Sequence, residues 1–252
     1  MARRQARFTP QDLAGDPRLQ DESPELWNEE FSDVVRALLT SAVRCFAMNG
    51  YHATTTRDIS GGAGLSPAAL YVHFPSKELV LYEIIRSGHQ CALTYIQDPS
   101  VTAITGAADR LRVVVARHTA WHARHHVAAR VAQYELAGLT AEHYEEIVRL
   151  RHQTNEVFRA AVARGVEDGT FAAVDVKRVA RCMLSLSIDL ARWYRLDGCD
   201  SPELLGEFYA DIALKMVGPG AAPPAGDGAG PAGGYEATGT GPVPVGVPDD
   251  AG

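Results

Sequence analysis

The chain has 252 residues and a formal net charge of −7, and 46% of its residues are hydrophobic. This length and apolar content allow one large domain or two smaller ones with a substantial core. The acidic balance argues against a generic nucleic-acid binder, which usually carries a basic footprint. No apolar run approaches the roughly 20 residues of a membrane helix, and no signal peptide is recognisable, so we expect a cytoplasmic protein without membrane contact.

Positive charge is nevertheless concentrated near the N-terminus. The segment from residue 36 to residue 77 has a single acidic residue, Asp58, against four basic ones, namely Arg36, Arg44, Arg57 and Lys77. A small positive end on an acidic body fits a protein that attracts DNA phosphates at one end only. The four cysteines are far apart and form no CxxC pair, which favours reduced thiols.

The first helix follows an irregular start. Residues 1–22 are polar, and we expect a disordered basic arm. The Ser23–Pro24–Glu25 sequence predicts a helix start, and the helix is expected to reach about Met48. Its apolar residues recur at helical spacing, which predicts a face packed in the core. They are Phe31, Val35, Leu38, Leu39, Ala42 and Phe46.

Residues 54–78, TTTRDISGGAGLSPAALYVHFPSKE, predict two short helices joined by a tight turn. Thr54 or Thr55 can cap the first helix, because a short hydroxyl side chain accepts a bond from an amide of the first turn. Gly64 suits the reversal, since glycine tolerates positive φ. Ser66 then restarts a helix before Pro67, and Pro75 ends it. This is the layout of a helix-turn-helix, whose second helix enters the DNA major groove.

The same stretch resembles the DNA-binding signature of the TetR family of bacterial transcription regulators. The resemblance runs from Phe31 to Ile85, and the helical layout fits the family to residue 217. The matching parts are Thr54 to Ile59, Ala63–Gly64–Leu65–Ser66, Leu70–Tyr71–x–His73–Phe74 and Ser76–Lys77–Glu78. Two departures stand out. Val72 replaces an aromatic that often reaches a phosphate, and Gly61–Gly62 costs the first helix about 1 kcal/mol per glycine relative to alanine.

Within this motif we assign roles by side-chain type and position. Phosphate contacts are expected from Thr54, Thr56, Tyr71, His73 and Lys77. Base edges are expected to face Arg57, Ser66, Ala68 and Ala69. Phosphate contacts fix the register on the duplex, and base contacts carry the sequence information.

Further helical patterns follow the motif. They cover residues 77–97, 106 to beyond 121, 127–136, 140–166, 175–194 and 201–217, with no strand-like alternation. We therefore predict an all-α protein: a three-helix DNA-binding domain (23–76) and a six-helix C-terminal ligand-sensing and dimerisation domain (77–217). Residues 218–252 contain 11 Gly and 7 Pro, which predicts a disordered tail.

The last two helices carry apolar stripes. The residues are Val179, Met183, Leu186, Leu190 and Tyr194 on the first, and Leu204, Phe208, Ile212 and Met216 on the second. Ordinary core packing would explain each stripe. The TetR resemblance implies instead that both helices meet their symmetry mates in a homodimer. DNA reading independently favours a dimer, because two recognition helices one helical turn apart read a near-palindromic operator.

The middle helices are expected to hold an effector. The resemblance implies a ligand-sensing domain, with candidate pocket residues Tyr82, His89, Trp121, Tyr134, Phe158, Met183 and Ser187; core packing also explains each. The run from Ala191 to Gly198, followed by Ser201–Pro202–Glu203, resembles members tied to lipid, fatty-acid or steroid breakdown. That implies a small hydrophobic acid or its CoA thioester. Arginines that could meet CoA phosphates are Arg117, Arg124, Arg130 and Arg151. No cofactor is expected.

Other readings remain open. His118, His122 and His126 are spaced i, i+4, i+8, but zinc normally needs three or four ligands, so we favour a cluster without metal. No GxSxG, Walker, HExxH or dinucleotide sequence is present, which argues against an enzyme. An all-α enzyme and a helix-turn-helix adaptor are the alternatives to a transcription regulator, most often a repressor that its ligand releases from DNA.

Overall fold

A computed structural model of the chain describes Leu19, Leu26–Trp27 and residues 30–220. These residues belong to one compact unit that extends to Ala221. The expected arm (1–22) and tail (218–252) lie outside the described residues except for Leu19 and for 218–220. Among the described residues, no helix is both long and apolar enough to cross a membrane.

The N-terminal part is built from α2 (Asp33–Asn49), α3 (Thr56–Gly62) and α4 (Pro67–His73). The predicted helix start at Ser23 lies outside the described residues. The expected continuous helix to Met48 is interrupted, because residues 30–32 are not helical. Helix α2 begins at Asp33, because the Ser32 hydroxyl accepts a bond from the Val35 amide and caps the helix there. Trp27, ahead of this cap, is buried and donates its indole N–H to Thr40.

The remaining helices confirm the all-α prediction. Their bounds are α5 Lys77–Gln97, α6 Pro99–Thr102, α7 Ala107–Arg124, α8 His126–Tyr134, α9 Ala141–Glu167, α10 Val176–Trp193 and α11 Pro202–Val217, with a 3₁₀ turn at Leu136–Gly138. Six of them match expected segments. Helix α6 was not foreseen: Asp98 caps it by accepting from the Ser100 amide, and Pro99 occupies its first position.

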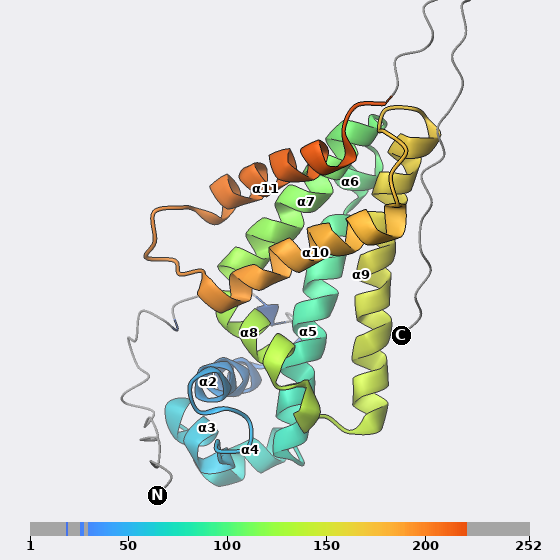
Figure 1. Cartoon of the computed structure of the whole chain (residues 1–252). Helices are drawn as coiled ribbons and strands as arrows, with labels where there is room; N and C mark the ends of the chain where they lie inside the picture. Colours follow the sequence, from blue (N-terminus) through green and yellow to red (C-terminus); the bar gives the residue numbers. More distant parts are fainter. Residues whose placement is uncertain (1–18, 20–25, 28–29, 221–252) are drawn as a thin grey trace, which may run out of the picture. The chain divides into compact units, whose positions relative to one another are not determined.

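Figure 1 shows how these helices are arranged. Helices α2, α3 and α4 lie at one end, and α5 leads from them into the helical body. Helices α10 and α11 lie side by side on the viewed face, and α11 packs closely on α7. One apolar core joins α2, α3 and α4 to α5 and α8, and a second lies among α7, α9, α10 and α11. In the described residues the only β-type pairing is an isolated bridge between Phe171 and Pro219.

Candidate functional site

The helix-turn-helix has the geometry that its local sequence predicts. Thr55 caps α3 through a capping box, in which its hydroxyl accepts from the Asp58 amide and the Asp58 carboxylate accepts from the Thr55 amide at 2.6 Å. Gly64 adopts φ +70° in the turn. Ser66 then caps α4 by accepting from the Ala69 amide, and Phe74 ends α4 in an extended conformation.

One side of α4 is open to solvent. Tyr71 is 54% exposed and Val72 is 78% exposed, although both are large apolar or aromatic residues. The Tyr71 hydroxyl lies 3.2 Å from the Thr56 hydroxyl, which fixes its direction against α3. Arg57, Ser66, Ala68 and His73 are also exposed, whereas Ala69 and Thr56 are half-buried. An exposed short helix with small first-turn residues has the surface needed to approach a nucleic-acid groove.

Two residues expected to contact phosphate have other partners in the fold. Thr54 is buried, and its hydroxyl donates to the carbonyls of Cys45 and Gly50 at 3.1 and 2.8 Å. The Lys77 ammonium donates to the carbonyls of Tyr51 and Thr54 at 2.7 and 2.8 Å. Both side chains therefore hold the turn that leads into α3.

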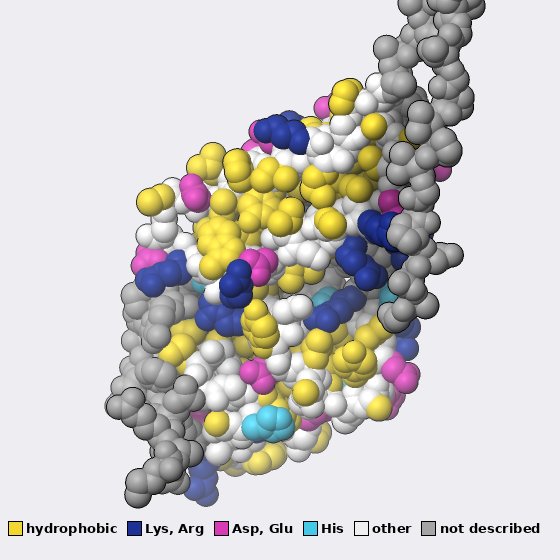
Figure 2. Space-filling model, viewed as in Figure 1, with side chains coloured by type: hydrophobic (Ala, Val, Ile, Leu, Met, Phe, Trp, Pro, Cys, Tyr) yellow, Lys and Arg dark blue, Asp and Glu magenta, His cyan; other side chains and the backbone are white. Residues whose placement is uncertain are grey.

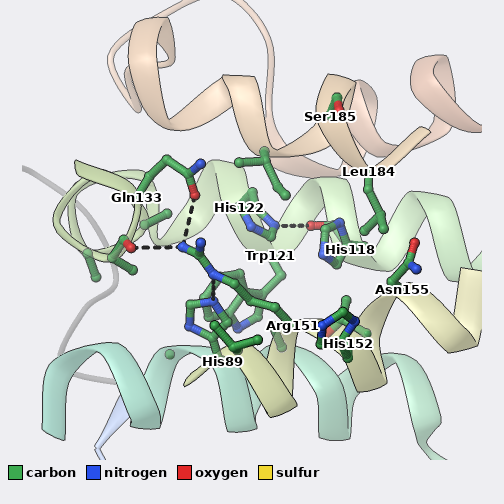
Figure 3. Close-up of a pocket in the computed structure, with 18 of the residues that line it drawn as sticks. His89, His118, Trp121, His122, Gln133, Arg151, His152, Asn155, Leu184 and Ser185 are labelled. Atoms are coloured by element: carbon green, nitrogen blue, oxygen red, sulfur yellow. Dashed lines mark hydrogen bonds between the residues drawn. The ribbon is translucent and has the colours of Figure 1, made fainter. Parts of the chain in front are cut away.

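A cavity of about 380 Å³ lies in the helical body. Its walls come from α5, α7, α8, α9 and α10 (Figure 3). Small residues on α5 and α8 leave the space open; they are Gly88, Ala92, Ala128, Ala129 and Ala132. Trp121 and Leu184 supply larger apolar surface. A mostly apolar space with a few placed polar groups is typical of a small-molecule site.

The structure brings two of the seven predicted pocket residues, His89 and Trp121, to this cavity. Phe158, Met183 and Ser187 are buried behind the wall, and Tyr134 is 59% exposed and borders a second hollow beside Trp193. Tyr82 is buried away from the cavity, stacks on His143 and donates to Glu146 at 2.7 Å. The sequence pattern gave no way to separate lining residues from those one layer behind.

Arg151 is the central polar group of the cavity. Its Nε donates to Nε2 of His89 at 3.1 Å, and its Nη2 donates to the Ala132 carbonyl and to Gln133 (Figure 3). Burial and the neighbouring Arg151 charge lower the pKa of His89 to about 4. His89 is therefore neutral near neutral pH and can accept from the guanidinium. The sequence offers Arg151 as a possible contact for CoA phosphates, but it does not predict the polar partners that Arg151 has in the cavity.

The histidines on α7 and α8 separate into different environments. His118 and His122 are buried and line the cavity, with ring centroids 4.3 Å apart. His126 packs instead against Tyr194. Within the described ranges, no group of three or more His, Cys, Asp or Glu side chains is placed to hold a metal ion. The i, i+4, i+8 spacing thus brings two of these rings, His118 and His122, to the cavity.

The other candidate phosphate-binding arginines are engaged on the surface. Arg117 donates to the Tyr95 carbonyl and to Ser100, and Arg124 pairs with Glu203. Arg130 donates to the Ala191 carbonyl and borders the second hollow. The structure therefore places these three arginines outside the cavity.

Helices α10 and α11 expose large apolar side chains. Leu186, Trp193, Leu204 and Phe208 are 42–58% exposed, and Figure 2 shows hydrophobic side chains gathered over these two helices. We call these four residues the α10–α11 patch. Three residues expected in the dimer interface, Met183, Leu190 and Tyr194, are instead buried within the chain. Val179, Ile212 and Met216 are half-buried, and Trp193 was not foreseen.

Comparison with known proteins gives two family matches. Residues 38–84 match the family described as "Bacterial regulatory proteins, tetR family", and residues 105–217 match "Tetracyclin repressor-like, C-terminal domain". The HTH-type transcriptional repressor KstR2 of Rhodococcus jostii is 30% identical over 179 residues, which cover 70% of this chain and 87% of the relative.

Solved structures of similar proteins share the fold. A bacterial regulatory protein in the tetR family from Rhodococcus RHA1 gives a TM-score of 0.69 at 36% identity, covering 75% of this chain and 99% of that one. The ketosteroid transcriptional regulator KstR2 of Mycobacterium tuberculosis gives a TM-score of 0.69 at 27% identity, covering 75% and 96%.

Proposed function

The chain belongs to the TetR family of bacterial transcription regulators, and from this premise we propose that it is a ligand-released repressor that binds a near-palindromic operator as a homodimer. The prediction that it is not an enzyme is confirmed, because the family and these relatives are transcription regulators. The proposal rests on one observation: helix α5 joins an exposed recognition helix to a cavity of about 380 Å³. Such a protein acts in the cytoplasm, where its operator lies.

Operator contacts come from the open side of α3 and α4. We assign base edges to Arg57, Ser66, Ala68 and Ala69, and phosphates to Thr56, Tyr71 and His73. Their exposed or half-buried side chains support this assignment. Thr54 and Lys77 support the same surface from within, because their polar groups bind the turn before α3.

The homodimer forms through the α10–α11 patch. Four large apolar side chains on two adjacent helices are more than the isolated exposed residues of an ordinary surface, and such patches mark association sites. A two-fold pair of these helices would also present two copies of α4 to successive major grooves of one operator.

The effector is a small hydrophobic acid, a steroid or an acyl-CoA. KstR2, named a ketosteroid transcriptional regulator, supports this class, as do the apolar cavity walls. Helix α5 starts at Lys77 beside the helix-turn-helix and carries Gly88 and His89 into the cavity wall, which supports it as the mechanical link. The effector releases DNA only if it binds more tightly to the conformation that fits the operator less well.

A gel shift with DNA upstream of the protein's own gene tests this function. We expect sequence-specific binding, abolished by Tyr71→Ala and kept by Tyr144→Ala, an exposed tyrosine on α9 far in sequence from the motif. Binding without sequence preference, or unaffected by Tyr71→Ala, would support the adaptor alternative. Mass spectrometry of small molecules that co-purify with the protein identifies the effector.

A further inference from the structure

Two of the cavity histidines, His89 and His122, have fixed tautomers. His122 Nδ1 lies 2.9 Å from the His118 carbonyl, and His89 Nδ1 lies 2.8 Å from the Ile85 carbonyl. A carbonyl oxygen can only accept, so each Nδ1 carries the hydrogen and each Nε2 is left as an acceptor. Burial lowers the pKa of His122 to about 4, so this ring is neutral at pH 7.

His118 is held by Ser187. Its Nδ1 lies 2.8 Å from the Ser187 hydroxyl oxygen, which itself lies 3.2 and 3.1 Å from the carbonyls of Met183 and Leu184. The single Ser187 hydrogen can go to a carbonyl or to His118 Nδ1, so this contact does not fix the His118 tautomer.

The two acceptors with fixed tautomers differ in their partners. His89 Nε2 accepts from Arg151, whereas Nε2 of His122 has no hydrogen-bond partner among the described residues. The His122 side chain is more than nine-tenths buried and lines the cavity (Figure 3), and its Nε2 is not among the fully enclosed unpaired atoms, so it is accessible from the cavity. This wall therefore matches a ligand that donates a hydrogen bond.

Arg151, on the α9 wall of the same cavity, offers the opposite chemistry. Its partners are His89, the Ala132 carbonyl and Gln133, and in the described part of the chain it pairs with no carboxylate. Its Nη1 has no partner there either. A half-buried guanidinium without a counter-ion is suited to an anionic group, which it can bind with strong, charge-assisted hydrogen bonds.

We propose that the cavity takes a hydroxylated amphipathic acid, with the acid group at Arg151 and a hydroxyl that donates to Nε2 of His122. This inference rests on the effector role proposed above. An unsubstituted chain leaves this acceptor unpaired, and a ketone or ester carbonyl at the same place would set lone pairs against lone pairs.

Calorimetry on the full-length protein tests the preference with matched probes. They are 12-hydroxydodecanoic acid with dodecanoic acid, and 10-hydroxydecanoic acid with decanoic acid. We expect the hydroxylated member of at least one pair to bind about five-fold more tightly or better, as one net hydrogen bond implies. Equal affinity within both pairs, tighter binding of the unsubstituted acids, or no binding of any of the four overturns the inference.

Two isosteric variants locate the acceptor. His122→Asn keeps a donor near the Nδ1 position for the His118 carbonyl but removes the Nε2 acceptor, so the preference should fall to within about two-fold. His122→Gln keeps a group that can accept near Nε2 and should retain it. Should His122→Asn fail to fold, as judged by circular dichroism, His122→Phe removes the same acceptor in its place. His52→Asn, an exposed histidine outside the cavity, is the control. A full preference in the folded His122→Asn or His122→Phe variant refutes the assignment.

The two proposals fail separately. Operator binding is measured by gel shift on the same preparation without ligand. If the protein without ligand shows no sequence-specific operator binding, the proposed regulator function is refuted. The calorimetry then tests the cavity chemistry by itself. A protein that binds its operator but shows no hydroxyl preference refutes the cavity chemistry alone.

Discussion

Lys77 illustrates how a residue's chemistry and its place in the fold can differ. A lysine at the end of a helix-turn-helix is suited to a phosphate contact. In the structure its ammonium lies 4.2 Å from the centre of the Tyr51 ring and donates to two carbonyls of the turn before α3. It therefore holds the position of α3 relative to α5.

Lys77→Ala should lower the free energy of unfolding by about 1–3 kcal/mol, because two carbonyls lose their charged donor. Urea denaturation followed by circular dichroism measures this. Arg57→Ala is the matched control. Arg57 is exposed and assigned to a base edge, so stability should stay within about 0.5 kcal/mol, while operator binding weakens by about 1–3 kcal/mol and loses specificity. If Lys77→Ala leaves the stability unchanged and lowers the salt slope of operator binding, Lys77 contacts a DNA phosphate instead.

The buried histidines should make stability depend on pH. Burial holds the folded pKa of His122 at about 4, below its ordinary 6.5, and also lowers that of His118 well below 6.5. Between these values the unfolded chain binds protons that the folded chain does not, so stability is full above about pH 6.5 and falls as the pH drops towards 4.

Each such histidine makes the free energy of unfolding change by up to about 1.4 kcal/mol per pH unit in that pH window. Urea unfolding at a series of pH values should show a shallower slope for His122→Asn, by up to that amount. Parallel curves for the parent and His122→Asn would contradict the buried neutral state.

At the scale of elements, α7 and α11 approach each other unusually closely. A Cβ at Gly206 would lie 2.6 Å from the Ala116 carbonyl oxygen, closer than real Cβ atoms come to backbone. The glycine thus sets the spacing of the two helices, and with it the position of Leu204 and Phe208 in the α10–α11 patch.

Gly206→Val should destabilise the protein by about 1–3 kcal/mol, because overpacking forces the two backbones apart. The midpoint of urea unfolding measures the loss. Gly61→Ala is a control with the opposite expected sign. Gly61 is exposed in α3 and has no positive φ, so alanine should raise the free energy of unfolding by about 0.5–1 kcal/mol. A neutral Gly206→Val would show that the α7–α11 contact can relax.

At the scale of the whole molecule, we expect operator affinity to depend on the dimer that forms through the α10–α11 patch. Phe208→Glu places a charge in the proposed interface and should give a monomer in sedimentation velocity at micromolar concentration. Operator affinity should then fall about 100-fold or more, because two linked recognition helices gain from effective concentration. Tyr144→Glu, at an exposed tyrosine outside the patch, should remain dimeric with parent affinity. A monomeric Phe208→Glu with full affinity would end the dimer proposal.

The sequence by itself determined the features that local chemistry controls. The caps at Thr55, Ser66 and Thr140, the reversal at Gly64 and the stop before Pro75 depend on neighbours within a few residues, so the helix bounds follow from short patterns. The helix-turn-helix could be recognised for the same reason.

Only the tertiary structure decided which of these residues are free to act. Helical periodicity marks an apolar face but not what covers it, so Met183 and Leu190 are buried while Leu186 and Trp193 of the same helix are exposed. The cavity depends on five helices whose separation is set by packing between distant segments. Residues such as Arg151 and His122 therefore meet only once the whole body has folded.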